Sequence, residues 1–136
     1  MPSKAQTTGM RGVYLVAAEL SRLGFIVSPT SRSAAGADLL VTDQACRRAY
    51  SVQVKTNART FAFWLIGKKA KEAVSPSHIY VLVNIRDSKK NGPAVEYFVL
   101  PSELIADLGS HVGDWPHVRR DKVLQYLNEW SPFGKP

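Results

Sequence analysis

The stretch 79–85 (Ile-Tyr-Val-Leu-Val-Asn-Ile) constrains the fold more than any other part of the chain, because it is nearly continuously apolar. A run of this length is far too short to span a bilayer. Its β-branched and aromatic residues favour a strand, and a strand without a polar face has to be covered on both sides. We therefore expect an α/β fold in which other elements cover both faces of the sheet.

The chain before this strand contains one predicted helix and three predicted strands. Apolar side chains at helical spacing, followed by Gly24, mark the helix. Short β-rich stretches, separated by Pro29, by a Ser/Thr/Ala/Gly-rich loop and by a polar turn, mark the strands. The predicted elements are a helix over 12–23, a strand over 25–27, a loop over 30–36 and a hairpin of strands over 39–42 and 50–56.

The rest of the chain predicts further helices and strands. Leu65, Ala70 and Ala73, with lysines between them, indicate a helix in the second half of 61–74 that ends before Pro76. The other predicted elements are a charged turn over 87–92, a strand over 95–100, a short helix over 101–108 and a last helix over 119–130. This order fits an α/β sandwich with a mixed central sheet flanked by helices.

The length of 136 residues suffices for one hydrophobic core, which would bury roughly two-thirds of the surface of the unfolded chain. The sequence shows no internal repeat and no low-complexity stretch. We therefore expect a single domain over 1–136, with a core over about 9–100 and a C-terminal helical extension over 101–136. The ends, 1–8 and 131–136, are expected to be loose.

Side chains of the predicted hairpin alternate between the two faces of the sheet. One face takes Tyr50, Val52 and Val54, and the other takes Ser51, Gln53, Lys55 and Asn57. A turn centred between Ala45 and Cys46 places Asp38 opposite Gln53, with the two side chains about 5 Å apart on one face. A slip of one residue would instead place Asp38 against Val54.

An acid, an amide and an ammonium group gathered in this way suit the metal-dependent cleavage of a phosphodiester bond. Mg²⁺ takes oxygen ligands, usually one or two carboxylates with water and substrate phosphate. Asp38 is the expected anchoring ligand, and Gln53 offers a side-chain carbonyl. Glu19, near the margin of the apolar stripe of the first helix, is the candidate for a further acid. Lys55 would orient the attacking water and stabilise the charge that builds on the phosphate.

The motif and the order of elements over roughly 9–100 resemble the PD-(D/E)XK, or restriction-endonuclease-like, nuclease superfamily, in the Q-x-K form that Mrr-like enzymes carry. The resemblance implies a core of a helix, three strands, a helix and a further strand. It places the motif aspartate at Asp38, the Glu-or-Gln position at Gln53, the lysine at Lys55 and the helix acid at Glu19. It also implies Mg²⁺ as cofactor, with Mn²⁺ as a substitute. Ala37 stands where the name-giving proline would be, and Gln53 replaces the commoner glutamate.

Each of these residues also has a purely structural interpretation. Asp38 follows a glycine and suits a turn. Gln53 and Lys55 suit the solvated face of a half-exposed strand. Glu19 can pair with Arg22 one helical turn away. Two functions therefore stay open: a metal-dependent nuclease, and an inactive module with the same fold that binds nucleic acid or a protein partner.

The net charge indicates a polyanionic partner. The chain has 18 Lys and Arg against 11 Asp and Glu, for a net charge of +7, and such an excess favours phosphate-rich ligands. Composition does not separate DNA from RNA, and DNA is the expected substrate of a nuclease here. The first candidates for phosphate contacts are Lys68, Lys69 and Lys71, because their predicted helix borders the site. The second candidates are the pairs Arg47–Arg48 and Lys89–Lys90, which lie in turns.

The three tryptophans, Trp64, Trp115 and Trp130, have two interpretations, stacking on nucleic-acid bases or packing in the core, and packing is the favoured one.

The single cysteine, Cys46, allows no intrachain disulfide and suits a reducing interior. The polar first residues lack a secretion signal, so the cytoplasm is the expected location and no membrane partner is expected. Because the chain has no obvious sequence-reading domain, we expect specificity to come from a homodimer, a partner subunit or DNA shape.

Overall fold

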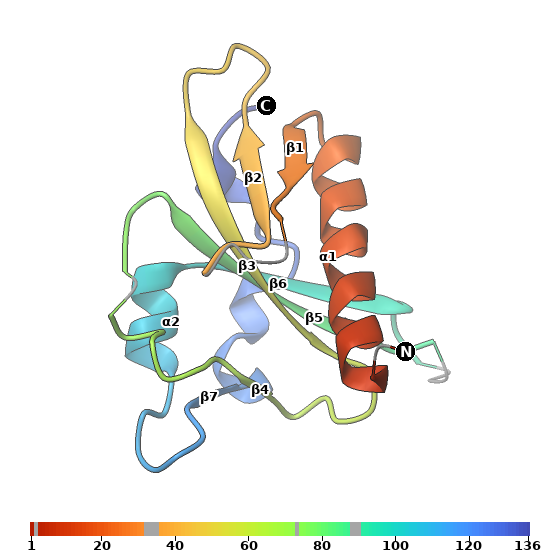
Figure 1. Cartoon of the computed structure of the whole chain (residues 1–136), viewed down its shortest axis with the longest axis vertical. Helices are drawn as coiled ribbons and strands as arrows, with labels where there is room; N and C mark the ends of the chain where they lie inside the picture. Colours follow the sequence, from red (N-terminus) through yellow and green to blue (C-terminus); the bar gives the residue numbers. More distant parts are fainter. Residues whose placement is uncertain (2, 32–35, 73, 88–90) are drawn as a thin grey trace.

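A mixed five-stranded sheet forms the centre of the computed structural model, which describes residues 1, 3–31, 36–72, 74–87 and 91–136 (Figure 1). The strands lie in the order β1-β2-β3-β5-β6, and the β3–β5 pair is parallel while the other neighbours are antiparallel. This arrangement confirms the predicted α/β fold with a mixed sheet. The strands are β1 (Ile26–Pro29), β2 (Leu39–Thr42), β3 (Ala49–Asn57), β5 (His78–Ile85) and β6 (Val95–Pro101).

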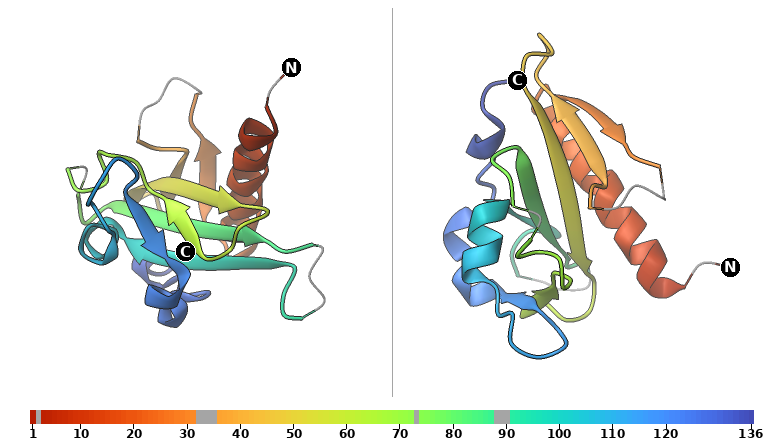
Figure 2. Two further views of the ribbon diagram at one scale, coloured as in Figure 1. Left: turned by 90° about the horizontal axis from the view of Figure 1, so that it is seen from below. Right: turned by 60° about the vertical axis from the view of Figure 1, so that its left-hand side comes forward.

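Two layers cover the sheet on opposite sides (Figure 2). Helix α1 (Lys4–Arg22) covers one side, where Val16 and Leu20 are fully buried. Helix α2 (Ser102–Leu108) and the small two-stranded sheet of β4 (Phe63–Leu65) and β7 (His117–Arg119) cover the other side. Strand β5 is therefore buried along its whole length, as its apolar sequence predicts. Among the described residues, no helix carries the unbroken apolar stretch that a bilayer crossing needs.

Helix α1 begins at Lys4 rather than at the predicted residue 12, so the expectation of a loose N-terminus was wrong. Ser3 accepts a hydrogen bond from the Gln6 backbone, and the Gln6 side chain accepts one from the Ser3 backbone. This reciprocal pair is a capping box, which stabilises the first turn of a helix. The early turns bury little apolar surface, so the periodicity used for the prediction did not reveal them.

The helix predicted within 61–74 is absent from the described residues of that segment. The backbone instead forms β4 and then turns at Lys68–Glu72. Gly67 adopts a φ of 82°, which interrupts any helix at this point. The β4–β7 pairing and a hydrogen bond from Ile66 N–H to the Pro116 carbonyl take the backbone groups that a helix would use.

The last predicted helix, over 119–130, is also wrong, and so is the prediction of a helical extension beyond α2. This part of the chain forms β7 and the short 3₁₀ turns Arg120–Lys122, Leu124–Tyr126 and Ser131–Phe133. Long-range contacts determine its path, because Arg120 pairs with the buried Glu96 at 2.7 Å and Asn128 N–H binds the Tyr97 carbonyl at 2.7 Å. Parts of the predicted loop over 30–36 and of the predicted turn with Lys89–Lys90 lie outside the described residues.

The crossing of α1 over β3 needs a glycine. A Cβ atom at Gly12 would overlap the Thr56 side chain, lying 2.8 Å from its Cβ and closer still to Oγ1. We predict that Gly12→Ala lowers the free energy of unfolding by about 1–3 kcal/mol through overpacking, as measured by urea denaturation. Gly9→Ala is the matched control, because a Cβ there meets nothing within 4 Å. This substitution should raise the free energy of unfolding by about 0.5–1 kcal/mol. Equal stability of the two variants would contradict the close approach.

Candidate active site at the edge of β3

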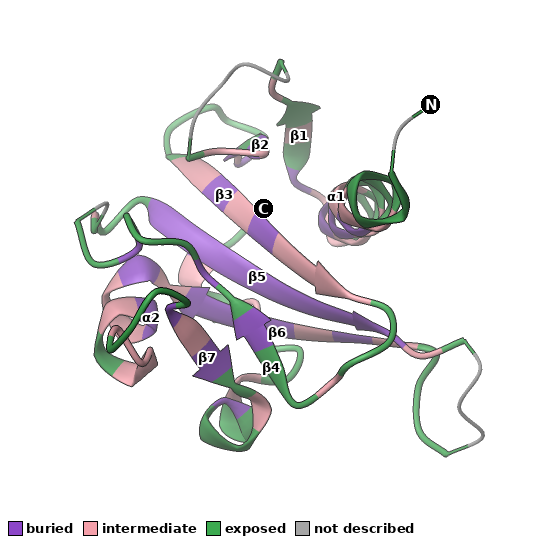
Figure 3. Ribbon diagram, turned by 60° about the horizontal axis from the view of Figure 1, so that its bottom comes forward, coloured by how far each residue is buried: buried purple, intermediate pink, exposed green. Residues whose placement is uncertain are grey.

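Strand β3 has one apolar and one polar face, as the alternation predicts. Val52 and Val54 are buried in the core beneath α1. Gln53 and Lys55 lie on the opposite face and are half-buried. Figure 3 shows this difference as alternating bands along β3, whereas the neighbouring β5 is buried throughout. The layer of α2 and β4 therefore covers the polar residues of β3 only in part.

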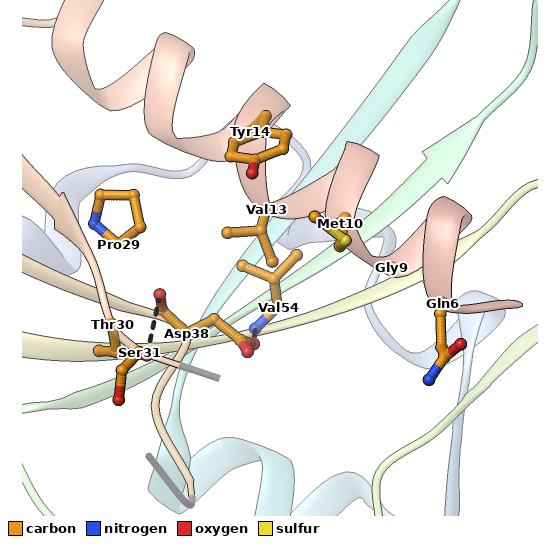
Figure 4. A pocket seen from close by; sticks show the side chains of 10 residues that line it. All are labelled: Gln6, Gly9, Met10, Val13, Tyr14, Pro29, Thr30, Ser31, Asp38 and Val54. Atoms are coloured by element: carbon orange, nitrogen blue, oxygen red, sulfur yellow. Dashed lines mark hydrogen bonds between the residues drawn. The ribbon is translucent and has the colours of Figure 1, made fainter. Parts of the chain in front are cut away.

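Asp38 lies where β2 stops and β3 continues. Leu39 pairs with Val52, and the Asp38 N–H binds the Val52 carbonyl at 2.7 Å, so the register places Asp38 opposite Gln53 as predicted. Beyond this point β2 offers no carbonyl to the N–H of Val54. The Asp38 carboxylate takes that place and accepts from Val54 N–H at 2.8 Å. Figure 4 shows Asp38 and Val54 next to each other. The same oxygen, Oδ2, accepts from Gln53 Nε2 at 3.1 Å.

Lys55 completes a group of three side chains at this edge. Burial lowers the pKa of the Lys55 ammonium below its ordinary value, and the nearby Asp38 carboxylate opposes this by favouring the charged form. Lys55 follows Gln53 by two residues on the same face of β3, and the two side chains line one hollow. The structure therefore brings Asp38, Gln53 and Lys55 together.

Two hollows meet at this group, one on each side of the sheet edge. Asp38 borders a hollow of about 330 Å³ between α1 and the β1–β2 end, with Val13 and Tyr14 of α1 opposite (Figure 4). Gln53 and Lys55 border a second hollow of about 310 Å³ on the other side of the sheet. The candidate site is thus an open edge where ligands can approach from two directions.

Glu19 does not join this group, which corrects the expectation from the sequence. Its carboxylate binds Arg22 at 2.5 Å, the structural alternative noted above. It does not line the hollow beside Asp38, and its charge raises the pKa of Tyr97 in addition to the larger effect of burial. The α1 residues that line the hollow with Asp38 are instead Gln6, Gly9, Met10, Val13 and Tyr14.

The basic residues proposed for phosphate contacts divide into two groups. Lys68 and Lys69 line the same hollow as Lys55, although they lie on a turn rather than on the predicted helix. Lys71 is exposed on the same turn but does not line that hollow. Arg47 and Arg48 lie at the far end of the β2–β3 hairpin, where their N–H groups bind Asp43 Oδ1 at 2.8 and 2.9 Å.

Two residues of the hollow beside Lys55 were not predicted from the sequence. His78 and Tyr80 reach it from β5, and Ser51 Oγ lies 2.7 Å from His78 Nδ1. Burial lowers the pKa of His78, and the hydrogen bond with Ser51 opposes this, so the ring favours the neutral form. Ser51 shares the polar face of β3 with Gln53. The parallel β3–β5 register that brings His78 to Ser51 could not be read from the sequence.

The donor set around Asp38 is sparse for a metal centre. The described part of the chain holds no group of three or more His, Cys, Asp or Glu side chains placed to share an ion. Asp38 and Gln53 offer one carboxylate and one amide oxygen. Such a pair suits Mg²⁺, which keeps several waters and takes one or two carboxylates together with substrate phosphate.

Comparison with known proteins identifies the fold. No protein-family model and no curated protein sequence matches this chain. One similar solved structure is Hjc, a Holliday junction resolvase from the archaeal hyperthermophile Archaeoglobus fulgidus, with a TM-score of 0.60 and 13% identity over 94% of this chain and 97% of that one. Another is a bacterial homing endonuclease, with a TM-score of 0.62 and 13% identity over 96% of this chain and 90% of that one. The chain thus shares the mixed α/β fold of these two structures.

The proximity of Asp38 and Lys55 can be tested without any substrate. Asp38→Asn keeps the shape and an oxygen acceptor for Val54 N–H but removes the negative charge. Because that charge favours the protonated ammonium, we predict that the pKa of Lys55 falls further in this variant, as measured by NMR titration of the lysine side chain. Asp107→Asn, at an exposed position of α2, is the matched control. An unchanged Lys55 pKa in Asp38→Asn would show that the two groups do not interact.

Proposed function

We propose that this protein is a metal-dependent nuclease that hydrolyses phosphodiester bonds, with DNA as its substrate. The observation that carries the proposal is the convergence of Asp38, Gln53 and the half-buried Lys55 at one open edge of the sheet. The fold supports it, because the two similar structures are a resolvase and an endonuclease. The positive net charge and the neighbouring Lys68 and Lys69 suit a polyanionic substrate.

Asp38 and Gln53 would hold a divalent cation, Mg²⁺ or, as a substitute, Mn²⁺. The Gln53 amide donates Nε2–H to Asp38 in the arrangement described above. Rotation of that amide by half a turn would place Oε1 beside the carboxylate, where the two oxygens could bind one cation. When bound, the metal would activate a water and neutralise charge on the phosphate. In this assignment the site is of the Q-x-K form, like that of Mrr-type enzymes.

Lys55 would contact the reacting phosphate. Its ammonium lies in a partly desolvated position, where a charge interacts more strongly than in bulk water. An approaching phosphate favours the protonated lysine, as the Asp38 carboxylate does. The ammonium can then orient the attacking water and stabilise the charge that develops on the phosphate oxygens.

A second candidate function follows from the sparse donor set. The described residues supply Asp38 as the one carboxylate of this group, so a module that binds nucleic acid or a protein partner without cleavage fits the same fold. Salt-sensitive DNA retention without metal-dependent cleavage would select this alternative.

Under either function we propose a cytoplasmic protein of one domain that acts as a homodimer or with a partner subunit.

Cleavage tests the proposed roles directly. We predict that Asp38→Asn and Lys55→Ala each lower the Mg²⁺-dependent nicking rate of supercoiled DNA by about 100-fold or more, because each removes a group that stabilises the transition state. Asp107→Asn and Lys122→Ala are the charge-matched controls at exposed positions and should cleave as the unaltered protein does. Circular dichroism verifies that all four variants are folded. Full activity in either site variant would contradict the assignment.

Gln53→Glu tests the metal site separately from turnover. A second carboxylate beside Asp38 adds negative charge and an oxygen ligand, so we predict that the affinity for Mg²⁺ and Mn²⁺ increases at least several-fold in isothermal titration calorimetry. Gln44→Glu, in the exposed β2–β3 turn, is the matched control and should leave the affinity unchanged. Equal affinity of Gln53→Glu and the unaltered protein would place the cation elsewhere.

A further inference from the structure

Trp115 differs from the other two tryptophans in its surroundings. Trp64 is buried, donates Nε1–H to the Val83 carbonyl at 3.0 Å and packs edge-on against Phe98. Trp130 is half-buried and packs against Tyr97 and Phe133. Trp115, in contrast, is 71% exposed. An exposed indole presents a large apolar ring with one polar N–H to solvent, and tryptophan is enriched where proteins contact ligands or partners.

The position of Trp115 relates it to the candidate active site. Together with Lys55 and Lys68 it lines a hollow of about 300 Å³, which also includes Leu65 of β4 and Asp114. Lys55 and Lys68 line the adjoining hollow beside Gln53 as well. A ligand held at Lys55 therefore lies between the metal-binding pair on one side and the indole on the other.

The backbone around Trp115 is held in place at several points. The Trp115 carbonyl lies 3.1 Å from His117 Nδ1, and the next carbonyl, of Pro116, accepts from Ile66 N–H at 3.0 Å. Ser110 and His117 exchange two backbone hydrogen bonds, which close the base of the loop. An aromatic ring on a backbone restrained in this way loses little conformational freedom when it binds a flat ligand.

The chemistry of this hollow suits a nucleobase rather than a second phosphate. The indole offers a flat apolar face for stacking. The Asp114 carboxylate repels phosphate but can accept a hydrogen bond from an exocyclic amino group. The ammonium groups of Lys55 and Lys68 suit the phosphate attached to the same nucleotide.

We propose that Trp115 is a stacking platform for an unpaired nucleobase that adjoins the phosphate held at Lys55 and Lys68. Bases inside a duplex are already stacked on their neighbours, so a base reaches the indole only from a single-stranded or opened segment. This inference rests on the proposed function and specifies its substrate class. DNA with unpaired nucleotides next to a duplex is preferred over an uninterrupted duplex.

The test measures binding without cleavage. A fluorescein-labelled forked DNA and a fully paired duplex of the same sequence are titrated with protein in EDTA, and affinity is read from anisotropy. We predict that Trp115→Ala weakens fork binding by about 5- to 100-fold, that Trp115→Phe keeps most of the affinity, and that neither changes duplex binding. Val112→Ala, an 87% exposed residue of the same loop, is the matched control and should bind as the unaltered protein does.

Three results would overturn the inference: no loss of fork affinity in Trp115→Ala, an equal loss for fork and duplex, or a change in oligomeric state by sedimentation with DNA binding intact. The last would identify Trp115 as a contact with a second copy of the chain. Quenching of tryptophan emission by the fork, absent in Trp115→Phe, is the expected independent signal. Because every measurement is made in EDTA, absence of nuclease activity would defeat the proposed function and leave this test valid.

Discussion

The hydrogen bond from Val54 N–H to the Asp38 carboxylate, at 2.8 Å, is the interaction on which the candidate site depends. A strand that continues beyond its partner leaves backbone groups that need another acceptor. Here that acceptor is an acidic side chain, so completing the sheet edge also fixes a carboxylate beside the polar face of β3. Gln53 and Lys55 follow on that face by strand geometry alone. The pairing of β2 with β3 therefore also brings the residues of the candidate site together.

The β-hairpin and the central strands could be predicted from the sequence because their signals are local. The alternation of apolar and polar residues over Tyr50–Asn57 determines which side chains share a face, and a short symmetric turn determines the register. The continuous apolar character of β5 predicts burial on both faces. These features include the position of Asp38 opposite Gln53 in the neighbouring strand, which the observed pairing of Leu39 with Val52 confirms.

The segments that were predicted wrongly depend on contacts between distant parts of the chain. The segment around Trp64 has apolar residues at helical spacing, but it pairs with β7. Arg120 binds the buried Glu96, and this contact rather than a helical pattern determines the path of the chain there. Glu19 has the expected position in sequence, but its carboxylate pairs with Arg22 and does not line the hollow beside Asp38. The hollow that joins Lys55 to Trp115 arises from the same β4–β7 pairing, so local patterns could not reveal it.

The central claim is that Asp38 and Gln53 share a divalent cation beside Lys55. The most direct measurement is a crystal structure of the protein grown with Mn²⁺, with anomalous difference density calculated at the manganese edge. We predict a peak between the Asp38 carboxylate and Gln53 Oε1, with the amide turned so that its oxygen faces the ion. Density elsewhere, or an unchanged hydrogen bond from Gln53 Nε2 to Asp38 at saturating Mn²⁺, would contradict it.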